Sequence, residues 1–444
     1  MKLKATLLAT LAAITLFPTA AVSEETADQA QDEEWGDDWG DDWDESEEST
    51  GPSIPITGFV ETTAGYRTQE AKVLRQEWVS QEIRARIQSF YQKGRFNLSY
   101  KGEAFYDGIL DEWHARNREA YVGFSPTSKM DVRLGRQPLT WGTGDLLFLN
   151  DFFPKDWVAF FSGYDMQYLK APSDALKVST YSQLVNIDFV WTPQFDSDNF
   201  ITGEKLVYYS PLANRVVAAP PELLAEDPGS SLSDGEFALR ANKKIDSVEY
   251  ALYLYRGYFK IPEGFNPLTF QPYFPLLNSV GGSVRGTFLG GIANMEYAYW
   301  DSKESDSGSN LLVPNSQSRF LIGYETEVVR NLTASVQYYV EHLHDYKKRK
   351  VAFSDPDLRP RKNRQVLTTR WTLVTDQGNL NYSLFAFYSP SDQDYYLIPS
   401  VYYRLSDKWQ FNAGANILGG DKNHTLFGQM ETNSNVYLRA KYLF

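Results

Sequence analysis

One feature constrains the fold of this chain more than any other: from about residue 55 onward, apolar and polar side chains alternate with a period of two. In residues 332–340, every second side chain is apolar or aromatic and most of the others are polar. Residues 82–90 repeat this pattern, with Arg84 and Arg86 on the polar face. A period of two is typical of β-strands. Since a strand buried on both faces rarely carries a charge at every second position, we expect strands with one apolar and one wet face.

The connections between these segments are alternately short and long. Tight turns such as Lys93-Gly94 and Ser406-Asp407 alternate with long polar loops. Short periplasmic turns and long external loops are typical of outer-membrane β-barrels, in which one strand face contacts lipid and the other a polar lumen. We therefore predict an all-β fold, a transmembrane antiparallel barrel of about 18 strands over residues 55–444. Sixteen strands remain an alternative, because residues 164–194 can be divided in two ways.

The N-terminus indicates export. Lys2 and Lys4 precede an apolar run, and small residues follow up to Ser23, so we interpret residues 1–23 as a secretory signal peptide. Residues 24–54 form an acidic, tryptophan-rich segment that we expect to be disordered and periplasmic, since residues 24–50 hold fourteen Asp or Glu and no Lys or Arg. This segment and the signal account for nearly all of the net charge of −14. We expect the outer membrane of a Gram-negative-type bacterium as the location.

The last segment supports this assignment independently. Side chains from Val436 to Phe444 alternate between an apolar face that ends on the terminal aromatic residue and a face with Arg439 and Lys441. This pattern resembles the C-terminal signature that barrel-assembly machinery recognises in outer-membrane proteins. Such recognition has a physical basis, because an extended segment can pair with an open sheet edge through its backbone while pockets bind every second side chain. We expect this machinery to be a partner during insertion.

Charged residues fall on the alternate strand positions that point into the lumen of the predicted barrel. One interpretation is a wall of cross-strand pairs that holds a wide barrel together. The other is an electrostatic constriction that selects solutes by charge. The predicted pore-lining residues are Glu82, Arg84, Arg86, Lys101, Glu103, Asp131, Arg133, Arg439 and Lys441.

One motif suggests a family. The segment from Leu134 to Gly142, LGRQPLTWG, resembles a strand end of alginate-export-type outer-membrane barrels and of a related group of barrels associated with RND-type exporters. The resemblance covers this strand and its loop, and elsewhere only the architecture. The resemblance implies a monomeric export or diffusion barrel, but it does not indicate which substrate the barrel carries. Alternation from Asp131 points Arg136 outward, so we expect a bulge or a rim position there.

The segment after this motif is unusually apolar for an external loop. A large apolar patch is unlikely to be left in water, so we expect this loop to fold into the barrel mouth or lumen. It would be either an internal plug or a hydrophobic guide for an amphipathic solute. The predicted plug residues are Leu147, Phe148, Phe152, Phe153 and Trp157.

Two further segments suggest binding. Trp35, Trp39 and Trp43 stand at even spacing in the acidic tail; they are either part of a solvated leader or anchors for a periplasmic transport protein. A basic loop is expected outside, where basic side chains can bind the phosphates of lipopolysaccharide, or less commonly guide an anionic substrate. Its predicted lipopolysaccharide-binding residues are Lys347, Lys348, Arg349, Lys350 and Arg361.

Signals for other functions are weak. The chain has no cysteine and only four histidines, of which His342 and His344 share a strand face, and two histidines without a third ligand are weak evidence for a metal. We expect no enzyme activity, cofactor, metal or nucleic-acid binding. The leading hypothesis is an outer-membrane transport barrel, porin-like or an export channel, for a polar, anionic or amphipathic solute. The alternative is a non-conducting partner of an RND-type exporter or lipid-transfer system, docked through the acidic tail.

Overall fold

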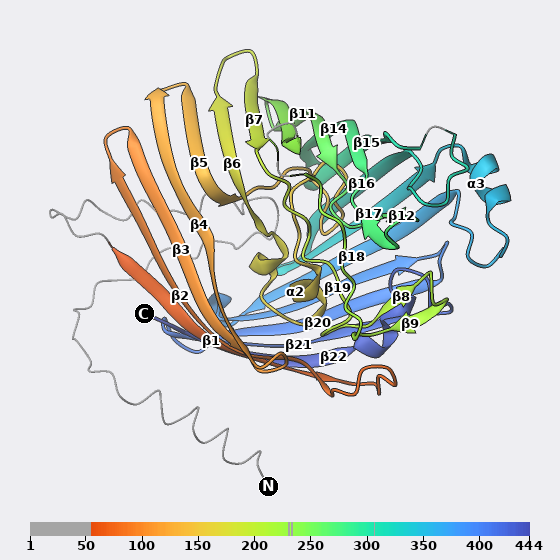
Figure 1. The fold of residues 1–444 in the computed structure, drawn as a ribbon. Coiled ribbons are helices and arrows are strands. Elements are labelled where there is room, and N and C mark those ends of the chain that lie inside the picture. The colour runs from red at the N-terminus through yellow and green to blue at the C-terminus, as the bar shows by residue number, and fades with distance from the viewer. Residues whose placement is uncertain (1–54, 230, 232–233, 306) are drawn as a thin grey trace, which may run out of the picture. The chain divides into compact units, whose positions relative to one another are not determined.

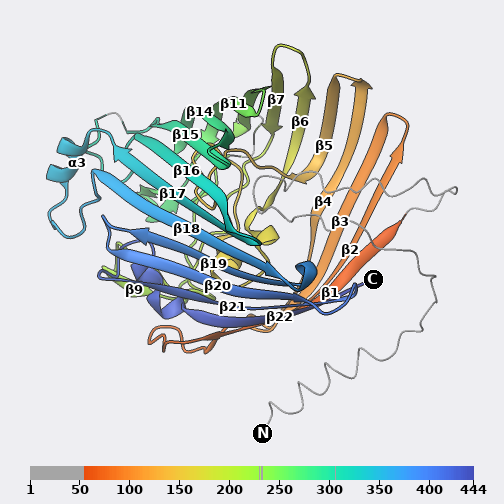
Figure 2. The same ribbon diagram turned by 180° about the vertical axis from the view of Figure 1, so that it is seen from behind.

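The computed structural model describes residues 55–229, 231, 234–305 and 307–444. Eighteen antiparallel strands form one closed sheet in which each strand pairs with its neighbours in the chain (Figures 1 and 2). They are β1 (Ile56–Arg67), β2 (Trp78–Lys93), β3 (Phe96–Asp107), β4 (Glu112–Thr127), β5 (Met130–Pro138), β6 (Pro172–Thr180), β7 (Asn186–Thr192), β10 (Glu236–Ile245), β11 (Val248–Tyr258), β14 (Leu276–Phe288), β15 (Gly291–Ser302), β16 (Gln317–Val329), β17 (Leu332–Leu343), β18 (Asn363–Thr375), β19 (Leu380–Ser389), β20 (Asp394–Arg404), β21 (Trp409–Gly420) and β22 (Asn435–Leu443).

The barrel closes between its first and last strands. β1 pairs with β22 from Phe59 opposite Leu443 to Arg67 opposite Asn435. The main chain of Phe444 extends this pairing, because it exchanges two 2.9 Å hydrogen bonds with Gly58. The predicted barrel and its count of 18 strands are confirmed. Residues 164–194 supply only β6 and β7, so the sixteen-strand alternative is wrong.

The predicted alternation is visible in the burial of each strand. On β2, Arg84 and Arg86 are buried inside the barrel, whereas Ile83 and Ile87 on either side of them are exposed on the outer face. The same order holds on β22, where Arg439 is buried and Leu438 is exposed. The wall therefore separates an apolar outside from a polar inside, as the sequence pattern requires.

The long connections lie at one end of the barrel and carry short elements of their own. They include the hairpins β8–β9 (Tyr208–Ser210 and Arg215–Val217) and β12–β13 (Gly264–Asn266 and Gln271–Tyr273), the helix α3 (Tyr346–Ala352) and the 3-10 turn η5 (Gly428–Asn433). The opposite end has tight turns, one of them the 3-10 turn η4 (Asp376–Gly378). No helix in the described ranges is long and apolar enough to cross a membrane.

One connection lies within the barrel. Residues 139–171, between β5 and β6, contain the helix α2 (Trp157–Phe161) and the 3-10 turn η2 (Met166–Leu169), and both views place α2 inside the wall (Figures 1 and 2). We call residues 139–171 the inner loop. Its contacts with the wall determine the shape of the candidate site.

Candidate functional site in the barrel lumen

The predicted pore-lining residues all lie on inward-facing strand positions, and most are paired. Lys101 contacts Glu119 at 2.7 Å, and Lys441 contacts Glu61 at 3.2 Å. Asp131 accepts a 2.6 Å hydrogen bond from Ser125. Arg133 stacks over the ring of Tyr121, 5.5 Å from its centroid. This pairing matches the interpretation of the charges as wall contacts for much of the lumen.

One group of charges departs from this pattern. Arg84 and Arg86 on β2 and Arg116 and Arg118 on β4 surround the ring of Tyr168, which projects from η2 of the inner loop. Their guanidinium carbons lie 4.3, 5.3, 5.6 and 4.8 Å, respectively, from the ring centroid. We call these four residues the arginine cluster. Contacts of this kind between cations and an aromatic face are attractive, so Tyr168 joins the inner loop to the wall.

Two carboxylates contact the arginine cluster. Glu103, on β3 between the two basic strands, contacts Arg84, accepts a 2.7 Å bond from Nε of Arg86, and lies 3.2 Å from Nε of Arg116. Glu82 lies 2.6 Å from Arg84. Four guanidinium groups with two carboxylates leave a local excess of two positive charges.

Arg118 is bound differently from the rest of the cluster. It donates to the backbone carbonyl oxygens of Gln167 and Lys170 at 2.9 and 2.8 Å. These bonds hold the inner loop and neutralise no charge. The positive excess is therefore built into the contact between the loop and β4.

The protonation states of Tyr168 and Asp165 in the inner loop agree with these contacts. Burial raises the pKa of the Tyr168 phenol, so its hydroxyl stays protonated at neutral pH and donates to Glu103 at 2.9 Å. Burial opposes ionisation of Asp165, but Lys441 and Arg439, at 3.0 and 3.2 Å, lower its pKa well below the usual range. A charged Asp165 therefore ties the loop to β22.

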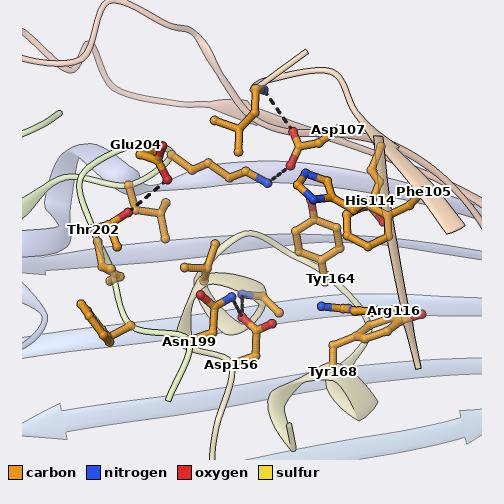
Figure 3. A pocket seen from close by; sticks show the side chains of 18 of the residues that line it. Phe105, Asp107, His114, Arg116, Asp156, Tyr164, Tyr168, Asn199, Thr202 and Glu204 are labelled. Carbon is orange, nitrogen blue, oxygen red and sulfur yellow. Dashed lines mark hydrogen bonds and ion pairs between the residues drawn. The ribbon is translucent and has the colours of Figure 1, made fainter. Parts of the chain in front are cut away.

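A cavity of about 320 Å³ adjoins the arginine cluster (Figure 3). Arg116 is the most open arginine or lysine that lines it, with about a third of the side chain exposed, and the similarly exposed His114 stacks on Phe105 beside it at 4.9 Å. Asp156 and Asn199 lie on the opposite side in Figure 3, joined by a 2.9 Å hydrogen bond. The wall side of the cavity therefore presents Arg84 and Arg116 together with the carboxylates of Glu82 and Asp107, and the loops add Lys205, Glu204 and Glu222.

The segment LGRQPLTWG directs the chain from the wall into the lumen. Gln137 donates to the carbonyl oxygen of Ala175 at 3.2 Å, and Thr140 donates to Asp151 at 2.9 Å. Trp141 packs edge-on against Phe153 at 5.1 Å. The motif thus has a structural role in the entry to the inner loop.

Arg136 of this motif faces outward at the rim. It contacts Asp174 at 2.8 Å, and β5 pairs with β6 without a bulge at this position. The rim position is therefore the correct one of the two alternatives, and no bulge in β5 is required.

Glu296 on β15 closes the first turn of the inner loop. Its carboxylate accepts four hydrogen bonds, from the backbone N–H and side chain of Thr143 at 2.7 and 3.0 Å and from those of Asn150 at 2.9 and 2.8 Å. Gly142 precedes this turn with a φ of +92°, and a Cβ there would lie 3.1 Å from the Glu296 carboxylate. Glycine therefore suits this position for both its backbone conformation and its size.

The predicted plug residues lie in two apolar clusters between the inner loop and the wall. Phe152 and Phe153 pack in the first, where Phe152 stacks on Tyr255 at 4.5 Å. Leu147, Phe148 and Trp157 pack at the edge of the second, whose centre is formed by Phe160 and Phe161 of α2 against wall residues that include Phe387, Tyr396 and Leu418.

The other predicted binding residues lie elsewhere. Lys347, Lys348 and Lys350 are exposed on α3. Arg349 instead donates to the carbonyl oxygen of Val313 at 2.8 Å, and Arg361 lies 4.0 Å from Asp392. Trp35, Trp39 and Trp43, the signal peptide and the acidic segment lie outside the described residues.

The paired histidines form no metal site in the described residues. The rings of His342 and His344 are 5.2 Å apart, and each has its own partner, Asn363 at 2.7 Å and Ser318 at 2.9 Å. No group of three or more potential ligands occurs in the described ranges. These contacts give both histidines a structural role at the rim.

Several residues of the site were absent from the sequence predictions. The inward position of Arg116 could have been predicted from the sequence, because His114 and Arg116 alternate with apolar residues on β4. Arg118 continues this alternation, whereas the inward position of Glu119 was hidden, since the β3–β4 register shifts between Lys101 and Gly102 and makes Arg118 the extra residue of a bulge. Tyr168, Asp165 and Glu296 depend on where the inner loop lies, which no periodicity shows.

Comparisons with known proteins support the fold. Neither the family models nor the curated proteins gave a match. Among solved structures, the chain is similar to OccD3 (OpdP) of Pseudomonas aeruginosa, with a TM-score of 0.51, 11% identity and coverage of 88% of this chain and 90% of that one. It is also similar to OccAB1 of Acinetobacter baumannii, with a TM-score of 0.50, 9% identity and coverage of 88% and 95%. At these identities the likeness shows the barrel fold.

Proposed function

We propose that this protein is an outer-membrane transport barrel of a Gram-negative-type bacterium that passes a polar, anionic solute. The observation that carries the proposal is the arginine cluster, which has four guanidinium groups and two contacting carboxylates beside a cavity inside a closed barrel. Basic groups in a narrow, low-dielectric passage attract anions and repel cations. The apolar outer face supports a membrane setting.

Arg116 is the residue through which we expect solute to be selected. Glu103 holds its Nε atom, while about a third of its side chain is exposed. Arg84 and Arg86 are almost fully buried and hold the wall together. An anion entering the cavity can therefore contact Arg116 without breaking the contacts that join the wall to the inner loop.

Planar-bilayer recordings of the full chain test this function. We expect a steady conductance whose reversal potential in a salt gradient indicates anion preference, and Arg116→Gln should reduce that preference. Arg240→Gln is the matched control, since Arg240 also faces the lumen but is paired with Glu249 away from the cavity. Cation preference in the wild type, or equal shifts in both variants, would contradict the proposal.

A second candidate is favoured by the inner loop itself. Its two apolar clusters contact the wall on both sides of the lumen, an arrangement suited to a closed barrel. In that case the protein would be a non-conducting partner of an RND-type exporter or lipid-transfer system, docked through Trp35, Trp39 and Trp43. Absence of conductance together with recovery of a periplasmic protein that depends on residues 24–50 would favour this function. Normal partner recovery without that segment would exclude docking through the tail.

The likeness to alginate-export-type barrels belongs with these proposals. It rests on one strand end and its loop, and the structure gives that segment a positioning role around Gly142. We also retain the proposed monomer, lipopolysaccharide contact through the exposed lysines of α3, and insertion by barrel-assembly machinery. The apolar outer face of the wall supports insertion into the outer membrane. The position of α3 in one of the long connections supports contact with lipopolysaccharide.

A further inference from the structure

A hollow of about 470 Å³ lies on the outer face of the barrel. Residues of β17 to β21 line it, and nine of the twelve are apolar or aromatic residues at outward-facing positions. Its larger side chains are Leu332, Trp371, Leu373, Tyr382, Leu384 and Val401, and its smaller ones include Pro399, Ala413 and Ala415. We call this hollow the outer groove.

The sequence explains why the wall is hollow here. The pairing of β20 with β21 runs from Leu397 opposite Ile417 to Ser400 opposite Gly414 and skips the two positions between them. One of these positions is Pro399, which has no N–H for the ladder. The short side chains of Ala413 and Ala415 then leave space beside the large rings of β18 and β19.

The position of the outer groove determines what can fill it. The residues that line it lie toward the tight-turn ends of their strands; Leu332, for example, is the first residue of β17. Aromatic side chains gather near this end, where Trp409 contacts Tyr442 at 5.0 Å. Such a girdle is typical of the membrane interface, and tight turns of outer-membrane barrels face the periplasm. In the proposed setting, the groove therefore opens into the inner, phospholipid leaflet.

The turns next to the groove carry both signs of charge. Lys408 and Asp407 are exposed at the β20–β21 turn, and Asp376 is exposed at the β18–β19 turn. A phosphate suits Lys408, and an ammonium group suits the two carboxylates. This complementarity favours a zwitterionic headgroup over a purely anionic one.

We propose that the outer groove is a binding site for a phosphatidylethanolamine-type phospholipid, with an acyl chain in the groove and the headgroup on the β20–β21 turn. Burial of the chain follows from the hydrophobic effect, since lining and ligand are both apolar. The proposal rests on the membrane setting of the proposed function and not on conduction. A barrel that conducts nothing can therefore still bind the lipid, and the two proposals fail separately.

Native mass spectrometry of the full chain tests this site with phosphatidylethanolamine and phosphatidylglycerol supplied in equal amounts. We expect one phosphatidylethanolamine to be retained preferentially by the wild type and lost from Ala415→Phe, which fills the groove. Ala293→Phe is the matched control, because Ala293 faces outward on β15 away from the groove. Heat-dependent gel migration verifies that each variant is folded.

Asp407→Lys is a second variant whose exposed side chain lies in a turn, so it decides the question if Ala415→Phe does not fold. It should abolish the preference for phosphatidylethanolamine, because it removes a carboxylate that suits the ammonium group and adds a cation that attracts the anionic lipid. Equal retention of the two lipids by the wild type would overturn the proposal, as would retention unaffected by filling the groove. A dimer in place of a lipid adduct would show that a second copy of the chain covers this face.

Discussion

The hydrogen bonds of Glu296 allow a quantitative prediction about the inner loop. In Glu296→Gln the side chain keeps its shape, but an NH₂ group replaces one acceptor oxygen. One pair of donors, from Thr143 or Asn150, then loses its partner. Two hydrogen bonds at about 1 kcal/mol each give a loss of about 2 kcal/mol in the free energy of loop closure. The open population of the first loop turn should therefore rise roughly 30-fold.

Amide hydrogen exchange followed by mass spectrometry measures this opening, because exchange of protected amides reports local unfolding. Peptides that contain Thr143 and Asn150 should exchange roughly 30-fold faster in Glu296→Gln, while peptides from the distant wall keep their rates. Glu249→Gln removes a lumenal carboxylate that contacts Arg240 and not the loop, so it controls for the lost charge. The reasoning is refuted if exchange in residues 143–150 is unchanged in Glu296→Gln or increases equally in the control.

Three further perturbations address the same loop. Gly142→Ala should loosen it by about 1–3 kcal/mol, because alanine disfavours a φ of +92°, and faster exchange at Thr143 checks this. Deleting residues 146–161 should increase conductance if the loop obstructs the lumen; unchanged current would exclude that role. Burial raises the pKa of Asp198 to about 6 despite Lys155. The pKa of Asp198 is higher when the inner loop is docked against it than in the unfolded chain. The contact between the inner loop and Asp198 should therefore strengthen as pH falls from 7 to 4, by at most about 3 kcal/mol. Trp157 donates a hydrogen bond to Asp198 at 2.7 Å, so its fluorescence measures this pH dependence. Asp198→Asn should remove the pH dependence.

The barrel was predictable because its periodicity is a local property of the sequence. Alternation placed Arg84, Arg86 and Glu103 inside and Ile83 outside without knowledge of any contact. The strand count followed from the turns, since each tight turn joins two neighbours that must pair. The terminal strand was predictable in the same way, and its pairing with β1 required only that the barrel close.

The candidate site was predictable only in part, because it combines local periodicity with a long-range loop. The apolar content of residues 146–161 indicated that the loop lies inside, since such a surface is costly in water. Which wall residues it meets depends on the path of the chain after Gly142. That path is fixed by Glu296, more than 150 positions away in the sequence, so no local pattern could place Tyr168 beside the arginine cluster.

The bulge at Arg118 shows how one irregularity changes the chemistry of the lumen. In a regular strand, adjacent residues point to opposite faces, so Arg118 and Glu119 would not both face inward. The register shift between Lys101 and Gly102 lets both do so. Glu119 then pairs with Lys101, whereas Arg118 turns to the carbonyl oxygens of the inner loop. The extra residue thus adds a cation that no carboxylate of the cluster compensates, and it accounts for one of the two excess positive charges of the proposed selectivity site.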